Sequence, residues 1–393
     1  MDTPHVPAVF DVPLEDLRRR RSYKWRAFTP DVLPAFVAEM DCVLAAPIRA
    51  ALKSASHLGD AGYAWPSPEL NEALAGFAAS RFGWKLDPDD VTLVPDVMMG
   101  VLELLRILCA PGDGVVVNPP VYPPFFSHIV EAGCRVVEAP LARAGTGYEL
   151  DFEALERAFE SARVFLLCNP HNPTGRVLTR EELDRVAELA ERHDVLVFAD
   201  EIHAPLVLSG ATHTPFLTLD APAVSRAIAF VSASKAWNLP GLKCAQVIAV
   251  TPAMRTAVQR LSEDVTFRVG HHGVLASTAA YRESGAWLDE LLAALDRNRR
   301  LMGRLLEERL PGAVYAPPQG GYLAWVDCSA LGLAADPATA FLERGRVAVR
   351  SGPDFGMGGD GFVRVTMGTS ATLLEEVVTR MAAAVPAAQH ASQ

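Results

Sequence analysis

The clearest pattern along the 393-residue chain is a series of short apolar runs, separated by stretches whose apolar positions have helical spacing. The runs predict strands over Val91–Val94, Gly114–Val117, Cys134–Ala139, Val164–Cys168, Val195–Ala199, Ala227–Val231 and Ala245–Val250. The helical spacing predicts helices over Ile48–Leu58, Glu69–Phe82, Met98–Cys109, Phe125–Glu131, Phe152–Ser161 and Arg180–Arg192. Because strands and helices alternate, we expect an α/β fold with a mostly parallel sheet and helices on both faces.

The two ends of the chain depart from this alternation. Beyond the last of these strands the spacing is helical to about residue 310, with one long amphipathic stretch over Ala286–Leu310. Strand-like runs then return at Gly320–Trp325 and Phe362–Gly368. Residues 1 to about 46 are rich in proline without a long periodic pattern, and residues 385–393 are typical of a frayed tail.

Three successive strands each lead into a polar side chain suited to chemistry. The fourth, fifth and sixth strands above are followed by the motifs Asn169–Gly175, Asp200–His203 and Ser232–Lys243. Because ligands in open α/β sheets bind beyond the carboxyl ends of strands, Asn172, Asp200 and Lys235 are expected to face one pocket. Burial disfavours the ammonium form of a lysine and frees its amine as a nucleophile, as Schiff-base chemistry needs. Taken alone, a lysine at a strand end is more simply explained as a chance occurrence.

An amide, an acid and a lysine in this order are what pyridoxal 5′-phosphate (PLP) requires. In these motifs and their spacing, over nearly the whole chain, the sequence resembles the fold-type-I PLP enzymes of the aminotransferase class I/II superfamily. The resemblance implies a large domain with a mostly parallel sheet flanked by helices, plus a smaller α+β domain. It places the large, PLP-binding domain at residues 47–285 and the small domain at 286–393, with an N-terminal segment, 1–46, joining the small domain.

The resemblance also implies which side chains hold the cofactor ring. Lys235 would carry the cofactor's aldehyde, and Asp200 would pair with the pyridinium nitrogen. Asn172 and His203 would reach the phenolate oxygen, where typical aminotransferases have a tyrosine in place of His203. Tyr122 would stack on the ring and exclude water. A structural histidine and a core tyrosine are the alternatives for His203 and Tyr122.

For the cofactor phosphate, the resemblance points to Ser232 and Lys243 and to the start of the helix predicted after Val91–Val94. Most family members have an arginine where Lys243 stands. The lysine keeps the positive charge but cannot make the paired hydrogen bonds to a phosphate that an arginine guanidinium makes. The backbone N–H groups of Val97 and Met98 can hold a phosphate at a helix start. Asp96 would repel a phosphate, and we expect it to cap the helix instead.

Two further positions concern the substrate and the assembly. Arg364 lies in the alternating strand Phe362–Gly368, and by resemblance it clamps the α-carboxylate of an amino-acid substrate, with a core carboxylate as the alternative partner. Asn172 and Tyr122 would also contact substrate. Tyr63, in the loop Gly62–Pro66, would cross a dimer interface to the cofactor phosphate and the substrate of the partner subunit, which implies a homodimer; a packing role is the alternative.

Several segments are similar to one subgroup, the cystathionine β-lyase or C–S lyase enzymes. They are Pro34–Asp41, Gly62–Pro66, the histidine at 203, Ser234–Asn238 and Gly320–Trp325. In that subgroup the first segment passes over the substrate carboxylate, although Glu39 and Cys42 here replace an aspartate and a phenylalanine; a domain-swapped arm would look the same. The resemblance implies a PLP-dependent β-lyase that cleaves L-cystathionine or related cysteine S-conjugates to a thiol (homocysteine), pyruvate and ammonia, in amino-acid metabolism and methionine biosynthesis.

Two other functions stay open. The same side chains serve a PLP-dependent aminotransferase of an L-amino acid, because both reactions begin at the same carbanion. Some members of the subgroup also regulate transcription factors by protein–protein interaction. The intact set of Lys235, Asp200, Asn172 and Arg364 argues against a purely non-catalytic regulator, which would be free to lose them.

The composition of the chain limits the partners and the cellular compartment that we expect for the protein. The formal net charge of −11 argues against nonspecific binding to nucleic acid or to an anionic membrane. The run Arg18–Arg21 is most simply a solvated helix end. No transmembrane-length stretch free of charges and no signal peptide is recognised. Six cysteines are scattered without a CxxC pair, which suits a reducing cytoplasm, and no metal-ligand spacing is found.

Overall fold

The computed structural model describes residues 9–65, 68–333 and 336–386 of the chain. Its main sheet has seven strands in the order β2-β10-β9-β8-β7-β3-β4. Their bounds are β2 Val91–Val94, β10 Ala245–Ile248, β9 Ala227–Val231, β8 Leu196–Asp200, β7 Val164–Cys168, β3 Gly114–Val117 and β4 Arg135–Glu138. All neighbouring pairs are parallel except those made by β10. The prediction of a mostly parallel sheet is confirmed.

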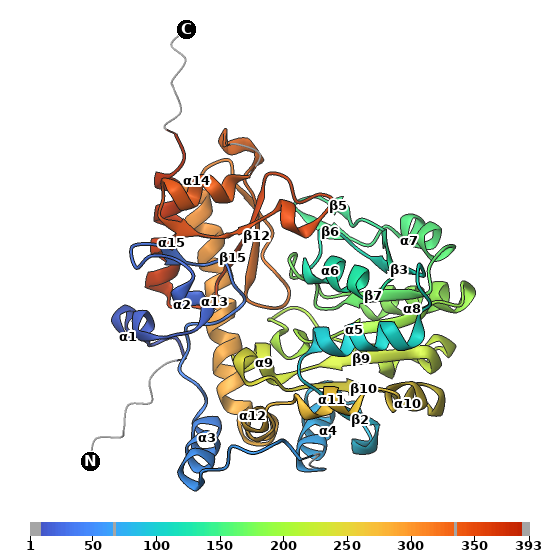
Figure 1. Ribbon diagram of the computed structural model, residues 1–393. Helices are drawn as coiled ribbons and strands as arrows, with labels where there is room; N and C mark the ends of the chain where they lie inside the picture. The colour runs from blue at the N-terminus through green and yellow to red at the C-terminus, as the bar shows by residue number, and fades with distance from the viewer. Residues whose placement is uncertain (1–8, 66–67, 334–335, 387–393) are drawn as a thin grey trace.

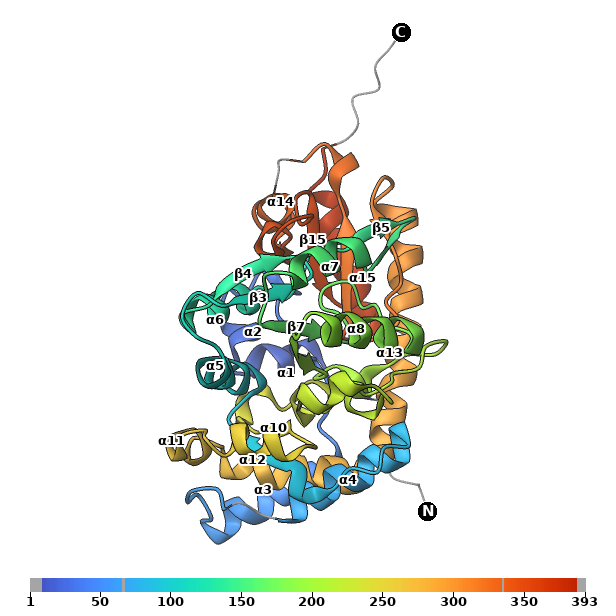
Figure 2. The same cartoon turned by 90° about the vertical axis from the view of Figure 1, so that its right-hand side faces the viewer.

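Helices cover both faces of this sheet (Figures 1 and 2). They include α3 Ala46–Leu58, α4 Pro68–Phe82, α5 Val97–Leu108, α6 Pro124–Glu131, α7 Phe152–Phe159, α8 Arg180–Arg192, α10 Pro252–Val258, α11 Glu263–Phe267 and α12 His271–Glu283. Side chains alternate along β3: Val115 and Val117 pack in the apolar cluster with α5 and α6, whereas Val116 packs in the cluster with α7 and α8. Burial on both faces explains why these strands read as continuous apolar runs.

The C-terminal part of the chain forms a second, antiparallel sheet in the order β11-β12-β15-β14. Its strands are β11 Val314–Tyr315, β12 Leu323–Asp327, β14 Arg350–Ser351 and β15 Phe362–Thr366, and its helices are α14 Pro337–Glu343 and α15 Ala371–Ala383. The long helix α13, Gly285–Arg309, runs from the main sheet to this part in both views (Figures 1 and 2).

The N-terminal segment packs on the C-terminal part. It holds two short helices, α1 Leu14–Arg19 and α2 Tyr23–Arg26, and strand β1 Leu33–Pro34, which pairs in parallel with β13 Val347–Ala348. This attachment is what a segment joining the small domain would make, although the boundaries at 46/47 and 285/286 stay predictions.

Local prediction was close wherever the apolar pattern was continuous. The bounds of β2, β3, β7, β9 and α8 agree with prediction, and Thr179 closes the expected capping box with Glu182 on α8. The strand predicted at Gly320–Trp325 begins only at Leu323, because Gly321 has a φ of 81° that breaks extended structure. The hairpin of β5 Ala142–Ala144 and β6 Gly147–Glu149 was not predicted. The predicted tail at 385–393 lies largely outside the described residues.

Candidate active site

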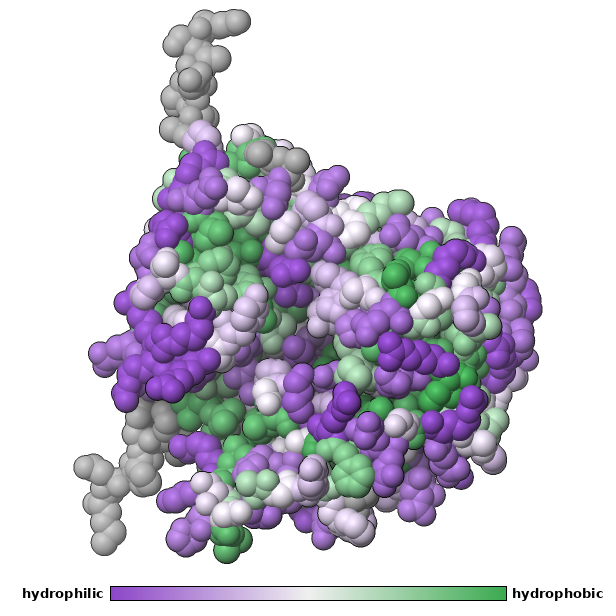
Figure 3. Space-filling view, viewed as in Figure 1, coloured by the Kyte–Doolittle hydropathy of each residue, from purple (hydrophilic) through white to green (hydrophobic). Residues whose placement is uncertain are grey.

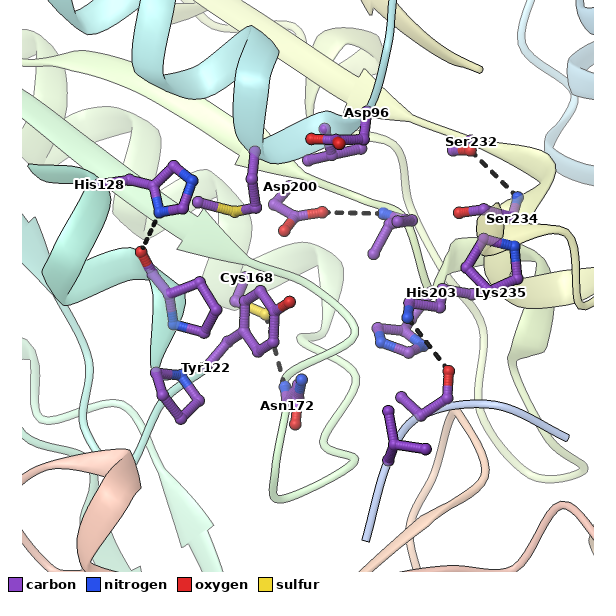
Figure 4. Close-up of a pocket in the computed structure, with 18 of the residues that line it drawn as sticks. Asp96, Tyr122, His128, Cys168, Asn172, Asp200, His203, Ser232, Ser234 and Lys235 are labelled. Carbon is purple, nitrogen blue, oxygen red and sulfur yellow. Dashed lines mark hydrogen bonds between the residues drawn. The ribbon is translucent and has the colours of Figure 1, made fainter. Parts of the chain in front are cut away.

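A cavity of about 500 Å³ lies where β7, β8 and β9 end, between the main sheet and the C-terminal part. Figure 3 shows this face of the molecule hollowed near its centre, and Figure 4 shows the cavity close up. The predicted residues that line it are Val97, Met98, Tyr122, Asn172, Asp200, His203, Ser232, Lys235, Lys243 and Arg364. The three neighbouring strand ends therefore bring Asn172, Asp200 and Lys235 to one site, as expected from the sheet edge.

Lys235 lies on α9, Ala233–Ala236, directly after β9. Its Nζ donates a hydrogen bond to the Ala38 carbonyl at 3.2 Å. Burial lowers the pKa of Lys235 to about 8; the Arg364 charge adds to this shift and Asp200 opposes it. A dehydrated lysine of this kind is partly a free amine near neutral pH, and so it can serve as a nucleophile or a base.

Asp200 ends β8 and is buried at the floor of the cavity. One carboxyl oxygen, Oδ1, accepts a hydrogen bond from the Ile202 amide at 3.1 Å. Burial raises the pKa of Asp200 to about 7, with the Ile202 amide and the Lys235 charge opposing that rise. A ligand cation placed against this carboxyl would favour its ionised form.

His203 is buried beside Asp200 and Lys235 in the cavity wall. Burial lowers its pKa to about 3, and the charges of Lys235 and Arg364 lower it further in the same direction. The ring is therefore neutral at pH 7 and carries one N–H donor. Within the described part of the chain its Nδ1 has no hydrogen-bond partner, which leaves a buried polar atom for a ligand.

Arg364 projects from β15 and joins the two parts of the molecule. Its Nη1 donates to Asn172 Oδ1 at 3.1 Å, and its Nη2 donates to the Phe36 carbonyl at 3.1 Å. Burial lowers the pKa of Arg364 to about 10, and its Nε is buried without a partner among the described residues. The guanidinium lies over the Phe355 ring, 5.1 Å from the centroid. This is a dehydrated cation with unused donor capacity, suited to an anion.

Tyr122 lies on the opposite wall of the cavity, among the residues labelled in Figure 4. Its ring makes an edge contact with Phe125, and the ring centroids are 5.7 Å apart. Burial raises the pKa of its hydroxyl, so the phenol stays protonated.

At the other end of the cavity, the start of α5 meets Lys243. Asp96 caps this helix as expected, since its Oδ1 accepts the Met99 amide at 2.9 Å. Its Oδ2 contacts Lys243 Nζ at 2.9 Å, which the sequence did not indicate. The Met99 amide is thus occupied, and the amides of Val97 and Met98 remain as the orphan donors of this helix start.

Ser232 is already engaged in the structure. Its hydroxyl donates to the Cys244 carbonyl at 2.7 Å and accepts from the Ser234 amide at 3.0 Å. This double use fixes the turn that leads into Lys235, and it leaves one lone pair of the hydroxyl oxygen for another donor.

Tyr63 stands apart from the other predicted residues. Its side chain is 81% exposed and does not line the cavity of its own chain. Its ring contacts Phe267 edge-on, with the centroids 5.8 Å apart. The predicted contact of Tyr63 with a partner subunit therefore stays a prediction.

The sequence did not reveal how the segment over residues 36–42 enters the site. The Ala38 carbonyl accepts from both Lys235 and the Tyr322 hydroxyl, the latter at 2.9 Å. A buried ion pair of Lys24 with Asp41, at 2.7 Å, holds the segment from the other side. A contact made by a backbone carbonyl cannot be recognised from the sequence. The buried pair of Lys24 and Asp41 identifies the attachment of this segment only in the structure, since lysine and aspartate are rarely buried unless they are paired.

Further cavity residues were also missed: Tyr23, His128, Cys168, Arg350 and Phe355. Tyr23, Arg350 and Phe355 come from short elements that were not predicted. His128 and Cys168 lie in predicted elements, but only tertiary packing brings them to the cavity. Among the residues described, no helix is both long and apolar enough to cross a membrane, and no cluster of three potential metal-binding side chains occurs.

Comparison with known proteins agrees with this geometry. Residues 39–381 match the model of the family described as aminotransferase class I and II. A Mycobacterium leprae protein provisionally named as a cystathionine β-lyase is 47% identical over 94% of this chain and 96% of its own. Cystathionine β-lyase PatB of Bacillus subtilis is 35% identical over 90% of this chain and 92% of its own. The structure of cystalysin from Treponema denticola, which contains a PLP cofactor, aligns with a TM-score of 0.88 and 27% identity, covering 93% and 96% of the two chains.

The chain therefore belongs to the aminotransferase class I and II family. The predicted family and fold class are confirmed, including the large sheet flanked by helices.

Proposed function

We propose that this family member is a PLP-dependent carbon–sulfur β-lyase that cleaves L-cystathionine or related cysteine S-conjugates to a thiol, pyruvate and ammonia. The observation that carries the proposal is the desolvated, half-buried amine of Lys235, which shares a cavity with Asp200 and Arg364 in a chain 47% and 35% identical to relatives named as cystathionine β-lyases. Homocysteine, as the thiol released from cystathionine, would place the enzyme in methionine biosynthesis.

The side chains of the cavity fit PLP. A protonated ring nitrogen would satisfy the buried Asp200 carboxyl, whose pKa is now raised to about 7. A phenolate oxygen would accept from Asn172 and from neutral His203, whose Nδ1 lacks a partner in the described structure. Tyr122 would cover one face of the ring.

The other end of the cavity fits the phosphate. The free amides of Val97 and Met98 would receive it at the start of α5. The ammonium of Lys243 would complete the contacts, joined by the hydroxyl of Ser232 once its proton turns from the Cys244 carbonyl to a phosphate oxygen.

When bound, PLP supplies an electron sink for the electrons released at the substrate's Cα. Arg364 and Asn172 would hold the α-carboxylate and orient the Cα–H bond for cleavage. Lys235, with a pKa of about 8, would remove the Cα proton and return a proton to the departing sulfur as the C–S bond breaks. The segment over residues 36–42 would help to orient this amine, because the Ala38 carbonyl accepts from Lys235 Nζ.

We also propose a homodimer in which Tyr63 reaches the cavity of the partner subunit. Exposed apolar side chains support an interface here: Leu58, Tyr63, Trp65 and Phe267. Figure 3 shows hydrophobic residues over this lower part of the molecule, where α3, α11 and α12 lie. An apolar patch of this kind is typical of an interaction site. Sedimentation of the purified protein as a monomer would contradict this assembly.

A reducing, cytoplasmic location is part of the proposal. It is supported by six cysteines that are all free and, with the exception of the half-buried Cys109, buried. Several contribute to the apolar cores and act as small hydrophobic residues.

The test is an assay of the purified protein with L-cystathionine. Pyruvate and free thiol released together, without any added keto acid, would support β-elimination. Turnover only with a keto-acid acceptor would make the protein an aminotransferase, the second function that the same side chains serve. A Lys235→Ala variant is the control for both. Wild-type protein that stays colourless after PLP is added would contradict the cofactor assignment.

A further inference from the structure

A second arginine stands beside Arg364 in the cavity wall. Strand β14 pairs antiparallel with β15, so that Arg350 lies directly opposite Arg364. Residues paired in this way project from the same face of a sheet, with Cβ atoms about 5 Å apart. Arg350 lines the same cavity as Arg364. Two arginines on one face are normally unfavourable, because like charges opposite each other repel.

The two arginines are compensated in different ways. Arg364 is buried and donates to the Asn172 and Phe36 oxygens. Arg350 pairs instead with Asp354, through Nε at 2.8 Å, and the side chains of both are 42% exposed. The ion pair uses one edge of the guanidinium, so the terminal Nη1 and Nη2 groups remain able to bind an anion. A half-exposed pair of this kind is held weakly and can exchange partners at little cost.

We propose that Arg350 and Asp354 form a second subsite, which binds the far end of a substrate that carries both a carboxylate and an ammonium group. This inference rests on the proposed β-lyase function and deepens it. Arg350 binds the distal carboxylate, and Asp354 accepts from the distal ammonium. Arg364 holds the carboxylate next to the scissile bond. The preferred substrates are thioethers with an amino-acid group at each end, such as cystathionine.

The two ends of such a substrate are matched by two different environments. The buried Arg364 sits where a Cα–H bond must be oriented exactly, and burial lowers its pKa to about 10, with the Arg350 charge adding to that effect. Arg350 stands nearer solvent, where binding needs less geometric precision. An S-alkyl cysteine offers the same reacting end but nothing for Arg350 or Asp354.

The experiment compares kcat/KM for L-cystathionine with kcat/KM for S-ethyl-L-cysteine, in wild type and in Arg350→Met. We expect the ratio of the two values to fall about tenfold, as for the loss of one charge-assisted contact, and mainly through the KM for cystathionine. General damage to the site lowers both values and cancels in the ratio. Arg350→Lys should restore part of the ratio, because it keeps the charge.

Arg180→Met is the matched control. Arg180 pairs with Asp184 four residues on, through Nε at 3.0 Å, with exposures of 45% and 43%, but it lies on α8 outside the cavity. This variant should leave the ratio at the wild-type value. For Asp354, S-(3-carboxypropyl)-L-cysteine lacks only the distal ammonium. Asp354→Asn should lower kcat/KM for cystathionine relative to this analogue about threefold.

A ratio that is unchanged in Arg350→Met, with both thioethers cleaved normally, would overturn the subsite and leave the β-lyase function standing. An equal loss in Arg350→Met and Arg180→Met would overturn it as well. Wild-type protein that eliminates thiol from neither substrate would instead refute the proposed function, and the subsite with it.

Discussion

The cavity has an aspartate and a lysine at each end, and the two sets differ in their contact with water. Asp200 is buried and Lys235 is half-buried, and desolvation brings their pKa values to about 7 and about 8. Asp96 and Lys243 form a 2.9 Å ion pair whose side chains are 37% and 56% exposed. The comparison shows that removal from water shifts the pKa values of Asp200 and Lys235 toward neutrality, whereas Asp96 and Lys243 meet as an exposed ion pair.

The largest effect is expected at the half-buried Lys235. Lys235→Ala removes the only amine that we assign to proton transfer, so kcat should fall by about 1,000-fold or more. The measurement is pyruvate release from L-cystathionine, with circular dichroism as a check of the fold. Lys243→Ala is the matched control at the hydrated end and should lose far less. Similar losses of kcat in Lys235→Ala and Lys243→Ala would contradict the difference proposed between the two ends of the cavity.

The next effect is expected at the buried acid. Asp200→Asn keeps the size of the side chain and removes its charge, so the ring nitrogen of the cofactor loses its stabilising partner. We expect kcat to fall by about 100-fold. The visible spectrum of the variant with PLP added reports whether the cofactor still binds. A variant that binds PLP and keeps wild-type kcat would refute the role proposed for Asp200.

The buried His203 should also make the free energy of unfolding depend on pH. Burial lowers the pKa of His203 from its usual 6.5 to about 3 in the folded protein. Between these two values the unfolded chain binds a proton that the folded chain does not, so the free energy of unfolding falls as the pH falls. His203→Gln should reduce this slope by up to about 1.4 kcal/mol per pH unit.

Urea unfolding of the cofactor-free protein at pH 7, 6 and 5 gives this slope. The exposed His57, on α3, supplies the control His57→Gln, which should leave the slope as it is in wild type. Equal slopes for wild type and His203→Gln would show that burial does not hold this histidine neutral.

The smallest effect is expected at the hydrated end. Asp96→Asn keeps an N-cap for α5 and releases Lys243 from its ion pair. With one negative charge fewer near the phosphate, the dissociation constant for PLP should fall about threefold, the range of an exposed ion pair. A PLP titration followed by absorbance measures it. Weaker binding of PLP by Asp96→Asn would contradict this prediction and would mean that Asp96 chiefly holds Lys243 in position for the phosphate.

Local sequence patterns determined most of the large sheet and the positions of its reactive groups. The run Val164–Cys168 is a strand in the structure with the bounds predicted, because a strand buried on both faces needs a continuous apolar run. Asn172 and Lys235 follow β7 and β9, and Asp200 ends β8 between them, so the strand ends bring the three together once the sheet forms. The capping roles of Asp96 and Thr179 are equally local, since the side chain and the amide it accepts from are three residues apart.

Only the tertiary structure decided what closes the site. The Ala38 carbonyl accepts a hydrogen bond from Lys235, which is almost 200 positions away in the chain. Because the acceptor is a backbone oxygen, any residue at position 38 could make this contact. The ion pair of Arg350 with Asp354 is local, but its place beside Arg364 depends on the pairing of β14 with β15. Burial, which sets the pKa values of Lys235 and Asp200, is a property of the assembled fold. The sequence alone therefore predicted the groups to which we assign the chemistry, and packing decided their protonation and their neighbours.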